Sequence, residues 1–265
     1  MEITIHEDNY LEHISPVVNG ERKSHGLIPR DYEARPFGSL MFAKPFDIPL
    51  IPESEWQKRL DAQIAAKGQL SDVRNAGMDG RPIPSRDQNG KGFCWGHSST
   101  SAALIVRAIN NEPYADLSAF AVCCIIKNYQ DQGGNGADSL EWIAKNGIPT
   151  SQFWPQQSMS RANDNPAMRA NAALHKFTQW MDLDPSQMKA QLVTCLLLGI
   201  PVVSDFDWWG HSVCTLDLVS INPFTTRIWN SWGDGWSQNG TGLLQGSKAI
   251  PNNALGARVM TVSMG

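Results

Sequence analysis

A glycine-rich polar loop that ends in a cysteine constrains the fold of this chain more than any other feature. Residues 87–93 read Asp-Gln-Asn-Gly-Lys-Gly-Phe, and Cys94 follows directly. Residues 101–109 then carry apolar side chains at helical spacing, which predicts a helix whose first turn holds Cys94. The unpaired N–H groups and the dipole at a helix N-terminus stabilise a thiolate, so we expect a lowered pKa for Cys94.

The composition limits the classes of partner. The chain has 265 residues, of which 18% are charged, and a formal net charge of -4. That length suffices for one large domain or two smaller ones. A net acidic chain offers no basic field for nucleic acid or for an anionic membrane surface. The longest apolar run, residues 192–198, is too short to span a bilayer, and residues 1–7 lack the pattern of a secretory signal. We therefore expect neither nucleic acid nor a membrane as a partner.

The cysteines form an odd set without the C-x-x-C spacing of a metal site. All but Cys94 have apolar neighbours, where a free cysteine behaves as a small buried hydrophobic residue. This pattern is typical of a protein in a reducing, intracellular compartment, and it predicts neither a metal site nor a cofactor. The set comprises Cys94, Cys123, Cys124, Cys195 and Cys214.

The first 85 residues differ from the rest, because prolines divide them into short apolar pieces. Residues 52–68 are the exception: acidic residues come early, Trp56, Leu60 and Ile64 share one helical face, and a glycine ends the segment. This predicts an amphipathic helix. We expect residues 1–85 to form an extended arm over a globular domain that spans residues 86–265. The prolines are Pro16, Pro29, Pro36, Pro45, Pro49, Pro52, Pro82 and Pro84.

The secondary-structure pattern changes along this domain. Apolar patterns predict helices first, whereas short runs of strand-forming residues separated by turn residues predict an antiparallel sheet later. The sequence therefore predicts an α+β fold, with a helical half over about residues 86–175, a stranded half over about residues 176–265, and a cleft between them. The expected helices follow Cys94 and cover 116–128 and 139–146, and the expected strands cover 201–206, 212–219, 227–230, 242–245 and 257–262.

A cysteine nucleophile needs a base, and the position of each histidine decides which can serve. His97 lies three residues after Cys94 on the same predicted helix, where it is poorly placed to accept the thiol proton. His211 instead opens an apolar strand, and the edge of a strand can present a side chain to a cleft. Taken alone, His211 is more simply interpreted as a packed histidine than as a catalytic one.

Three segments, taken together, resemble the papain-like cysteine proteases. Residues 228–236, Ile-Trp-Asn-Ser-Trp-Gly-Asp-Gly-Trp, are similar to the family's N-S-W-G-x-x-W-G signature. Residues 88–95 resemble its Q-G-x-C-G-x-C-W segment, and residues 210–213 resemble its histidine motif. The segments occur in the family's order. The resemblance extends from about residue 85 to the C-terminus, does not include the arm, and implies a papain-like fold with a barrel-like stranded half.

The resemblance implies a role for each matching residue. Cys94 corresponds to the nucleophile and His211 to the base that later protonates the leaving amine. Asn230 would orient the imidazole, and Trp232 would shield that contact from water. Gln88, six positions before Cys94, would form the oxyanion hole with the backbone N–H of Cys94.

Two departures from the family concern a disulfide. Lys91 and Gly134 stand where the family has the two cysteines of one bridge. Both partners are replaced together, which also favours a reducing compartment.

Residues 133–137 resemble the family's G-C-N-G-G loop. The resemblance implies that Gly136, Ala137 and Trp232 contact substrate, with Ala137 in place of a glycine whose backbone pairs with it. Asp138 would lie near the pocket for the second residue before the scissile bond, which predicts a preference for a basic residue there.

The arm and the activity leave alternatives open. Residues 1–85 occupy the place of a family pro-segment, and they either inhibit by lying through the cleft or anchor the domain to a protein partner. The leading interpretation is a cysteine endopeptidase that acts on polypeptides. A papain-fold structural protein with a vestigial site and a thiol acyltransferase are the alternatives.

Overall fold

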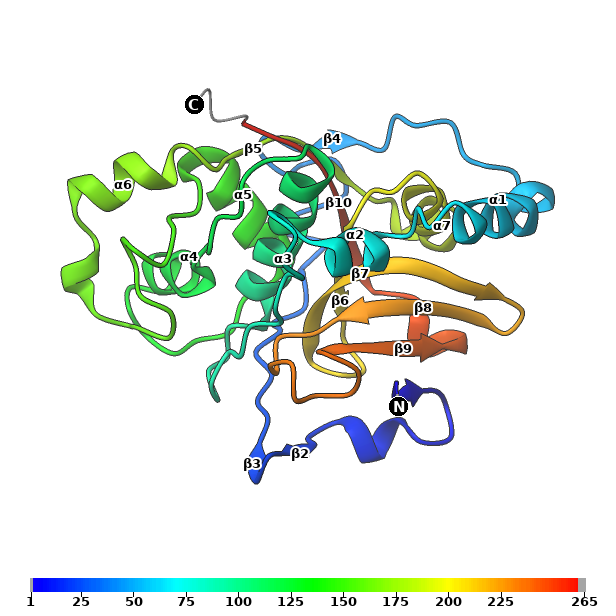
Figure 1. The fold of residues 1–265 in the computed structure, drawn as a ribbon, viewed down its shortest axis with the longest axis horizontal. Coiled ribbons are helices and arrows are strands. Elements are labelled where there is room, and N and C mark those ends of the chain that lie inside the picture. The colour runs from blue at the N-terminus through cyan, green and yellow to red at the C-terminus, as the bar shows by residue number, and fades with distance from the viewer. Residues whose placement is uncertain (1, 262–265) are drawn as a thin grey trace.

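The computed structural model describes residues 2–261, which form one large sheet flanked by helices (Figure 1). The α-helices are α1 (Glu53–Ala65), α2 (Leu70–Ala76), α3 (Cys94–Ile109), α4 (Ala119–Ile126), α5 (Gly136–Asn146), α6 (Pro166–Ala172) and α7 (Met188–Leu197). The strands are β1 (Thr4–Ile5), β2 (Val17–Val18), β3 (Glu21–Arg22), β4 (Lys44–Pro45), β5 (Phe177–Asp182), β6 (Val202–Phe206), β7 (His211–Ile221), β8 (Phe224–Trp229), β9 (Thr241–Gln245) and β10 (Asn253–Met260). None of the helices in this range is long and apolar enough to cross a membrane.

The large sheet has the strand order β1-β9-β8-β7-β6-β10-β5-β4. Its strands from β9 to β5 pair antiparallel, whereas the edge strands β1 and β4 are parallel to their neighbours. The predicted α+β fold, with helices first and an antiparallel sheet later, is confirmed. The pair β2–β3 forms a separate hairpin.

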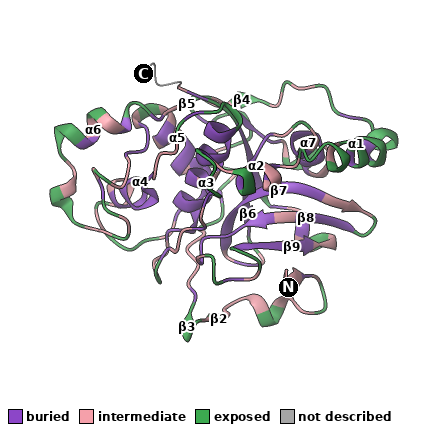
Figure 2. Cartoon of the chain, viewed as in Figure 1, coloured by how far each residue is buried: buried purple, intermediate pink, exposed green. Residues whose placement is uncertain are grey.

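Helix α3 is the central helix of the molecule. Almost all of its residues are buried, because it packs against strand β7 on one side and against helices α4 and α5 on the other (Figure 2). Apolar side chains cover its middle turns, so burial here stabilises the fold through the hydrophobic effect. The packing fixes the first residue of α3, Cys94, at the junction of the helical and stranded halves.

The predicted elements are present with small shifts at their ends, but the sequence interpretation missed several. Strand β5 and helices α2, α6 and α7 were not predicted. The signal for α6 was available, since Asn165 caps its N-terminus through Met168 N and Pro166 is its first residue. The last residue of the strand predicted over 257–262, Val262, lies outside the described residues.

The arm is part of the body rather than a separate layer. It supplies both edge strands of the large sheet and helix α1, and Ile5 and Leu60 are buried in the hydrophobic core. The predicted helix over 52–68 is α1, with Trp56 and Leu60 buried but Ile64 48% exposed. Parts of residues 2–85 therefore share one sheet and one core with the residues that follow them.

Candidate active site

Cys94 is the first residue of α3 and is fully buried against the start of β7. One turn later on the same helix face, the Ser98 hydroxyl lies 2.8 Å from the Ser212 hydroxyl of β7. The backbone N–H of Ser212 is close enough to the Cys94 thiol to lower the pKa of that thiol. Because His211 immediately precedes Ser212, the helix and the strand bring Cys94 and His211 to the same place between the two halves.

The orientation of the His211 ring is fixed by Asn230. The Nε2 atom of His211 lies 2.7 Å from Asn230 Oδ1, and the backbone N–H of Ser231 donates to the same oxygen at 2.7 Å. That oxygen accepts the Ser231 proton, so Nε2 of the ring donates to it and Nδ1 carries the lone pair. Nδ1 is buried without a hydrogen-bond partner. The ring therefore keeps its free basic atom available for a proton.

Aromatic rings seal the His211–Asn230 pair from water. The Trp232 ring lies 4.7 Å from the His211 ring, and the Trp209 ring lies 4.9 Å from it. Both tryptophans are almost fully buried. A hydrogen bond in such surroundings is electrostatically stronger than one in water.

Gln88 lies beside this pair with its side-chain amide oriented. The Ser231 hydroxyl donates to Gln88 Oε1 at 2.6 Å, and the backbone N–H of Gln88 donates to the Ser231 carbonyl at 3.0 Å. The Nε2 group of Gln88 is left to donate elsewhere, at 2.6 Å to the Lys91 carbonyl and at 3.1 Å to the Ser24 carbonyl. Ser231 thus connects Asn230 to the amide that the resemblance assigns to the oxyanion hole, a role for Ser231 that the sequence interpretation did not assign.

Residues 23–28 of the arm, here called the strap, lie across this site. The backbone N–H groups of Gly26 and Leu27 donate to the Gly210 carbonyl, at 3.3 and 3.0 Å. Ile28 N donates to the Gly134 carbonyl at 2.8 Å, and Gly134 N donates to the Gly26 carbonyl at 2.9 Å. The strap therefore pairs with both walls of the site. Figure 1 shows this part of the arm rising from β3, between the helical side and the strands, toward β4.

The strap also contacts His211, Trp232 and Gln88 directly. The His25 ring packs edge-on against the His211 ring at 5.2 Å and against the Trp232 ring at 5.6 Å. Trp232 Nε1 donates to the Ser24 carbonyl at 3.1 Å. The strap also occupies the side-chain N–H group of Gln88, whose Nε2 atom lies 3.3 Å from the carbonyl oxygen of His25.

A glycine is required where the strap is closest to the Cys94 loop. Gly26 has a φ of 150°, and a Cβ on it would lie 2.2 Å from the Gly92 carbonyl oxygen. A real Cβ does not approach backbone atoms this closely, so any larger residue at this position must lift the strap.

While the strap is in place, burial disfavours the charged forms of the Cys94 thiol and the His211 imidazole. It raises the pKa of the Cys94 thiol to about 12, with backbone N–H groups acting in the opposite direction and the nearby Asp205 charge adding to the rise. Burial lowers the pKa of His211 well below its ordinary value, and the neighbouring His25 adds to this effect. The prediction of a lowered pKa for Cys94 is therefore wrong for the strapped form, because desolvation outweighs the helix N-terminus.

His97 and the predicted substrate-contact residues 136–138 lie on two different helices, α3 and α5. His97 is buried within α3 and packs edge-on against Phe120 at 5.7 Å, away from any role as the base. Gly136, Ala137 and Asp138 form the first turn of α5.

The backbone contact implied for Ala137 belongs to another residue in the strapped form. Ala137 is fully buried against the core, and Gly134 is the residue of this loop that exchanges backbone hydrogen bonds with the strap. Asp138 forms an ion pair with Arg35 of the arm.

A buried carboxylate near Cys94 was not anticipated. Asp205 of β6 is fully buried, accepts from Asn253 Nδ2 at 2.7 Å and accepts from Gly136 N at 3.0 Å. Burial raises the pKa of Asp205 to about 6. No short sequence motif marks this residue, because its neighbours come from three separate elements.

No group of three or more histidine, cysteine or carboxylate side chains in residues 2–261 is arranged to hold a metal ion. All five cysteines are free thiols.

The fold is that of the papain-like cysteine proteases. Cys94 begins helix α3, which packs against strand β7, and His211 at the start of β7 contacts Asn230. The chain is similar in structure to xylellain, a cysteine protease from Xylella fastidiosa, with a TM-score of 0.62 and 16% identity over 89% of this chain and 97% of that one. It is also similar to digestive procathepsin L2 from the larval midgut of Tenebrio molitor, with a TM-score of 0.60 and 18% identity over 89% of this chain and 78% of that one.

Sequence comparison gives a narrower match. Chymopapain from Carica papaya is 29% identical over 101 residues, which are 37% of this chain and 29% of chymopapain. The match thus spans less than a third of the length of that curated relative. No family model matches the chain.

Proposed function

We propose that this protein is a cysteine endopeptidase, with Cys94 as the nucleophile and His211 as the general base. The observation that carries the proposal is the 2.7 Å contact between His211 Nε2 and Asn230 Oδ1. That contact leaves the lone pair on Nδ1 of His211, the first residue of a strand that packs against the helix beginning with Cys94. A thiol, a base with its free nitrogen available and a third group that orients the base are the elements of nucleophilic catalysis.

In the proposed reaction, His211 Nδ1 takes the thiol proton and the thiolate of Cys94 attacks the carbonyl carbon of a peptide bond. A C–S bond forms, and the carbonyl π electrons move to the oxygen. The amide N–H of Gln88 and the backbone N–H of Cys94 stabilise this oxyanion. The protonated His211 then gives its proton to the leaving amine, and the C–N bond breaks. Water, deprotonated by His211, hydrolyses the thioester and returns the thiol.

The strap supports the inhibitory alternative for the arm. Its Ser24 and His25 carbonyls use the Gln88 donor that the reaction needs, and its backbone uses Gly134 and Gly210. The raised pKa of Cys94 and the lowered pKa of His211 keep both groups neutral under the strap. The described form of the protein is therefore a resting form on this account.

The proposed substrate is a polypeptide, with a basic residue preferred at the second position before the scissile bond. The support for this preference is the ion pair between Asp138 and Arg35, in which an arginine of the arm already contacts that carboxylate. Profiling with a peptide library tests the preference, and selection of hydrophobic residues at that position would contradict it. A reducing compartment is proposed because the five cysteines are all free.

The test of the activity compares wild type with Cys94→Ser and His211→Ala on a broad fluorogenic peptide substrate, before and after the strap is displaced. We expect both substitutions to lower kcat/KM by at least about 10³-fold, as losses of nucleophile or base do. No hydrolysis in any form of wild type would favour the structural alternative. Amine incorporation into a glutamine substrate without hydrolysis would favour the acyltransferase.

A further inference from the structure

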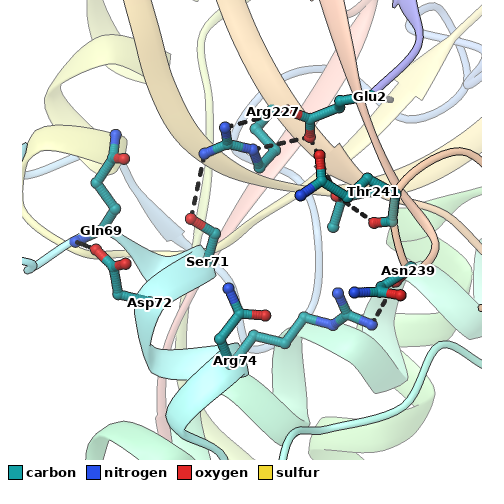
Figure 3. A pocket seen from close by; sticks show the side chains of 10 residues that line it. Glu2, Gln69, Ser71, Asp72, Arg74, Arg227, Asn239 and Thr241 are labelled. Atoms are coloured by element: carbon teal, nitrogen blue, oxygen red, sulfur yellow. Dashed lines mark hydrogen bonds and ion pairs between the residues drawn. The ribbon is translucent and has the colours of Figure 1, made fainter.

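Two cavities lie where helix α2 of the arm meets the stranded half. The first has a volume of about 310 Å³ and is lined only by polar side chains, which come from Glu2, α2, β8, β9 and the turn before β9 (Figure 3). The second, of about 300 Å³, lies between α2, residues 82–84 and the same turn. Arg74, Asn75 and Asn239 line both cavities, so the two lie side by side. No residue of the proposed active site lines either one.

The two arginines of the first cavity differ in how far they are paired, and Arg227 is fully paired. Its Nε and Nη2 atoms donate to the two carboxylate oxygens of Glu2, at 2.9 and 3.2 Å. Its Nη1 atom donates to Asp217 Oδ2 at 2.9 Å. The charge of Arg227 is therefore balanced within the protein and is not left for a ligand.

Arg74 is buried but only weakly paired. Its side chain is 4% exposed, and Nη2 donates to the Asn239 carbonyl at 2.7 Å and to Asp234 Oδ1 at 3.3 Å. The same Asp234 oxygen accepts from the backbone N–H of Ser85 at the shorter distance of 2.8 Å, and Asp234 is 50% exposed. The Nε group of Arg74 is buried without a partner. In Figure 3 the Arg74 side chain extends from α2 along the cavity toward Asn239.

A buried guanidinium with so little compensation is a place for an anion. Burial lowers the pKa of Arg74 to about 10, and the Asp234 charge acts only in part against this. A bound anion would supply the missing counter-charge. The carboxylates of Asp72 and Asp234 line the same cavities, so a dianion such as phosphate would meet repulsion. A carboxylate carries one charge, and its planar shape matches the guanidinium.

The other groups around Arg74 match a peptide. Asn75, Gln238 and Asn239 carry side-chain amides, which both donate and accept hydrogen bonds, as peptide groups require. Residues 82–84, Pro-Ile-Pro, add apolar surface to the second cavity. A carboxylate that is joined to a peptide group and an apolar side chain is the end of a polypeptide chain.

We propose that these two cavities bind the carboxyl end of a peptide, with the terminal carboxylate on Arg74 and the last side chain against residues 82–84. The site gives a polypeptide a second contact outside the proposed active site. That use rests on the proposed function, whereas binding itself requires no hydrolysis.

The test measures binding to full-length Cys94→Ser protein by isothermal titration calorimetry. The probes are N-acetyl-Ala-Leu with a free carboxylate, the same dipeptide as its C-terminal amide, and an acetylated octapeptide that ends in the same two residues with a free carboxylate. We expect the free dipeptide and the octapeptide to bind with similar affinity. The amide should bind at least about 10-fold more weakly, because the contact with Arg74 requires the negative charge.

Variants locate the binding. Asn75→Asp adds a negative charge at an exposed position that lines both cavities, and it should weaken binding of the free dipeptide by about 10-fold or more. Gln57→Glu, which adds the same charge at an exposed position of α1, is the matched control and should leave the affinity unchanged. Arg74→Gln should remove the difference between acid and amide, with thermal unfolding as the check that this variant folds.

Three results would overturn the proposal: equal affinities for acid and amide, an affinity that Asn75→Asp does not change, or inorganic phosphate that binds as tightly as the free dipeptide. Binding of the dipeptide without binding of the octapeptide would contradict recognition of a chain end. Peptide binding in a protein whose wild type hydrolyses no peptide would defeat the proposed function and leave this site standing. Hydrolysis without such binding would defeat this site alone.

Discussion

The Ser231 hydroxyl donates to Gln88 Oε1 at 2.6 Å, one residue after the asparagine that orients His211. A single turn after β8 thus contacts both Asn230, the partner of the His211 ring, and the side-chain amide of Gln88. The backbone N–H of Ser231 fixes the Asn230 amide, while its side chain fixes the Gln88 amide. The two groups with proposed catalytic roles, His211 and Gln88, are therefore coupled through one residue.

Removing the Ser231 hydroxyl should weaken the oxyanion donor without removing it. For Ser231→Ala combined with Gly26→Ala, a change that lifts the strap, we expect kcat to fall about 10-fold with little change in KM, less than the 10²–10³-fold expected for Gln88→Ala in the same background. Ser54→Ala, at an exposed position of α1, is the matched control and should leave both constants unchanged. Equal kcat values for Ser231→Ala and wild type would show that Gln88 needs no such support.

Adding one methyl group to the strap should open the site. Gly26→Ala places a Cβ 2.2 Å from the Gly92 carbonyl oxygen, and the strap must lift to relieve this contact. We expect alkylation of Cys94 in the variant to be about 10-fold faster than in wild type. Gly80→Ala is the control, because Gly80 also has a positive φ but open space around its Cβ position. If alkylation of Cys94 were equally fast in the two variants, the clash with Gly92 would not be the cause of the faster alkylation, and a general effect of strain at a positive φ would explain it.

Acid should displace the strap through His25. Burial lowers the pKa of His25 to about 4, against about 6.5 for a solvated histidine. A lowered pKa means that the closed form is favoured above about pH 6.5 and loses this contribution as the pH falls toward 4.

The measurement is the ratio of Cys94 alkylation rates in wild type and His25→Phe between pH 4 and 7. The ratio reports on the titration of His25 and on its effect on the neighbouring His211. It should rise as the pH falls, by up to about tenfold per pH unit. A ratio independent of pH would exclude His25 as the titrating group.

Removing a large buried side chain from helix α1 of the arm should destabilise the whole protein. Trp56 is 4% exposed and packs in the core that also contains α7 and β7. We expect Trp56→Ala to lower the free energy of unfolding by about 3–5 kcal/mol in urea titration. Ile64→Ala on the exposed side of α1 should cost less than about 1 kcal/mol. If α1 unfolded in a separate early transition in wild type, the arm would be an independent unit after all.

The sequence predicted the elements that follow a local pattern. Helix α3 and strand β7 have apolar periodicity, and motif spacing selected Cys94 and His211 from the ends of these two elements. The contacts of the strap could not be predicted in this way. Gly26 meets Gly92 and Gly134, and Arg30 meets Asp182, across long sequence separations that leave no local signal.

The pKa of Cys94 shows a second limit of sequence reasoning. A helix N-terminus can be recognised from sequence, and its effect on a thiolate is favourable. Cys94 is buried in a cluster with Trp95 and Phe120, against which Leu27 of the strap also packs, and the resulting desolvation is the larger effect. The sign of the shift thus follows from tertiary structure.

Mapping the adduct of an epoxide thiol reagent tests the central claim most directly. In the Gly26→Ala variant, whose strap is lifted, the reagent should modify Cys94 alone among the five cysteines, and the loss of peptide hydrolysis should match the extent of modification. His211→Ala should abolish this selectivity. Modification spread over several cysteines, or hydrolysis that persists once Cys94 is fully modified, would contradict the assignment of Cys94 and His211 as the reactive pair.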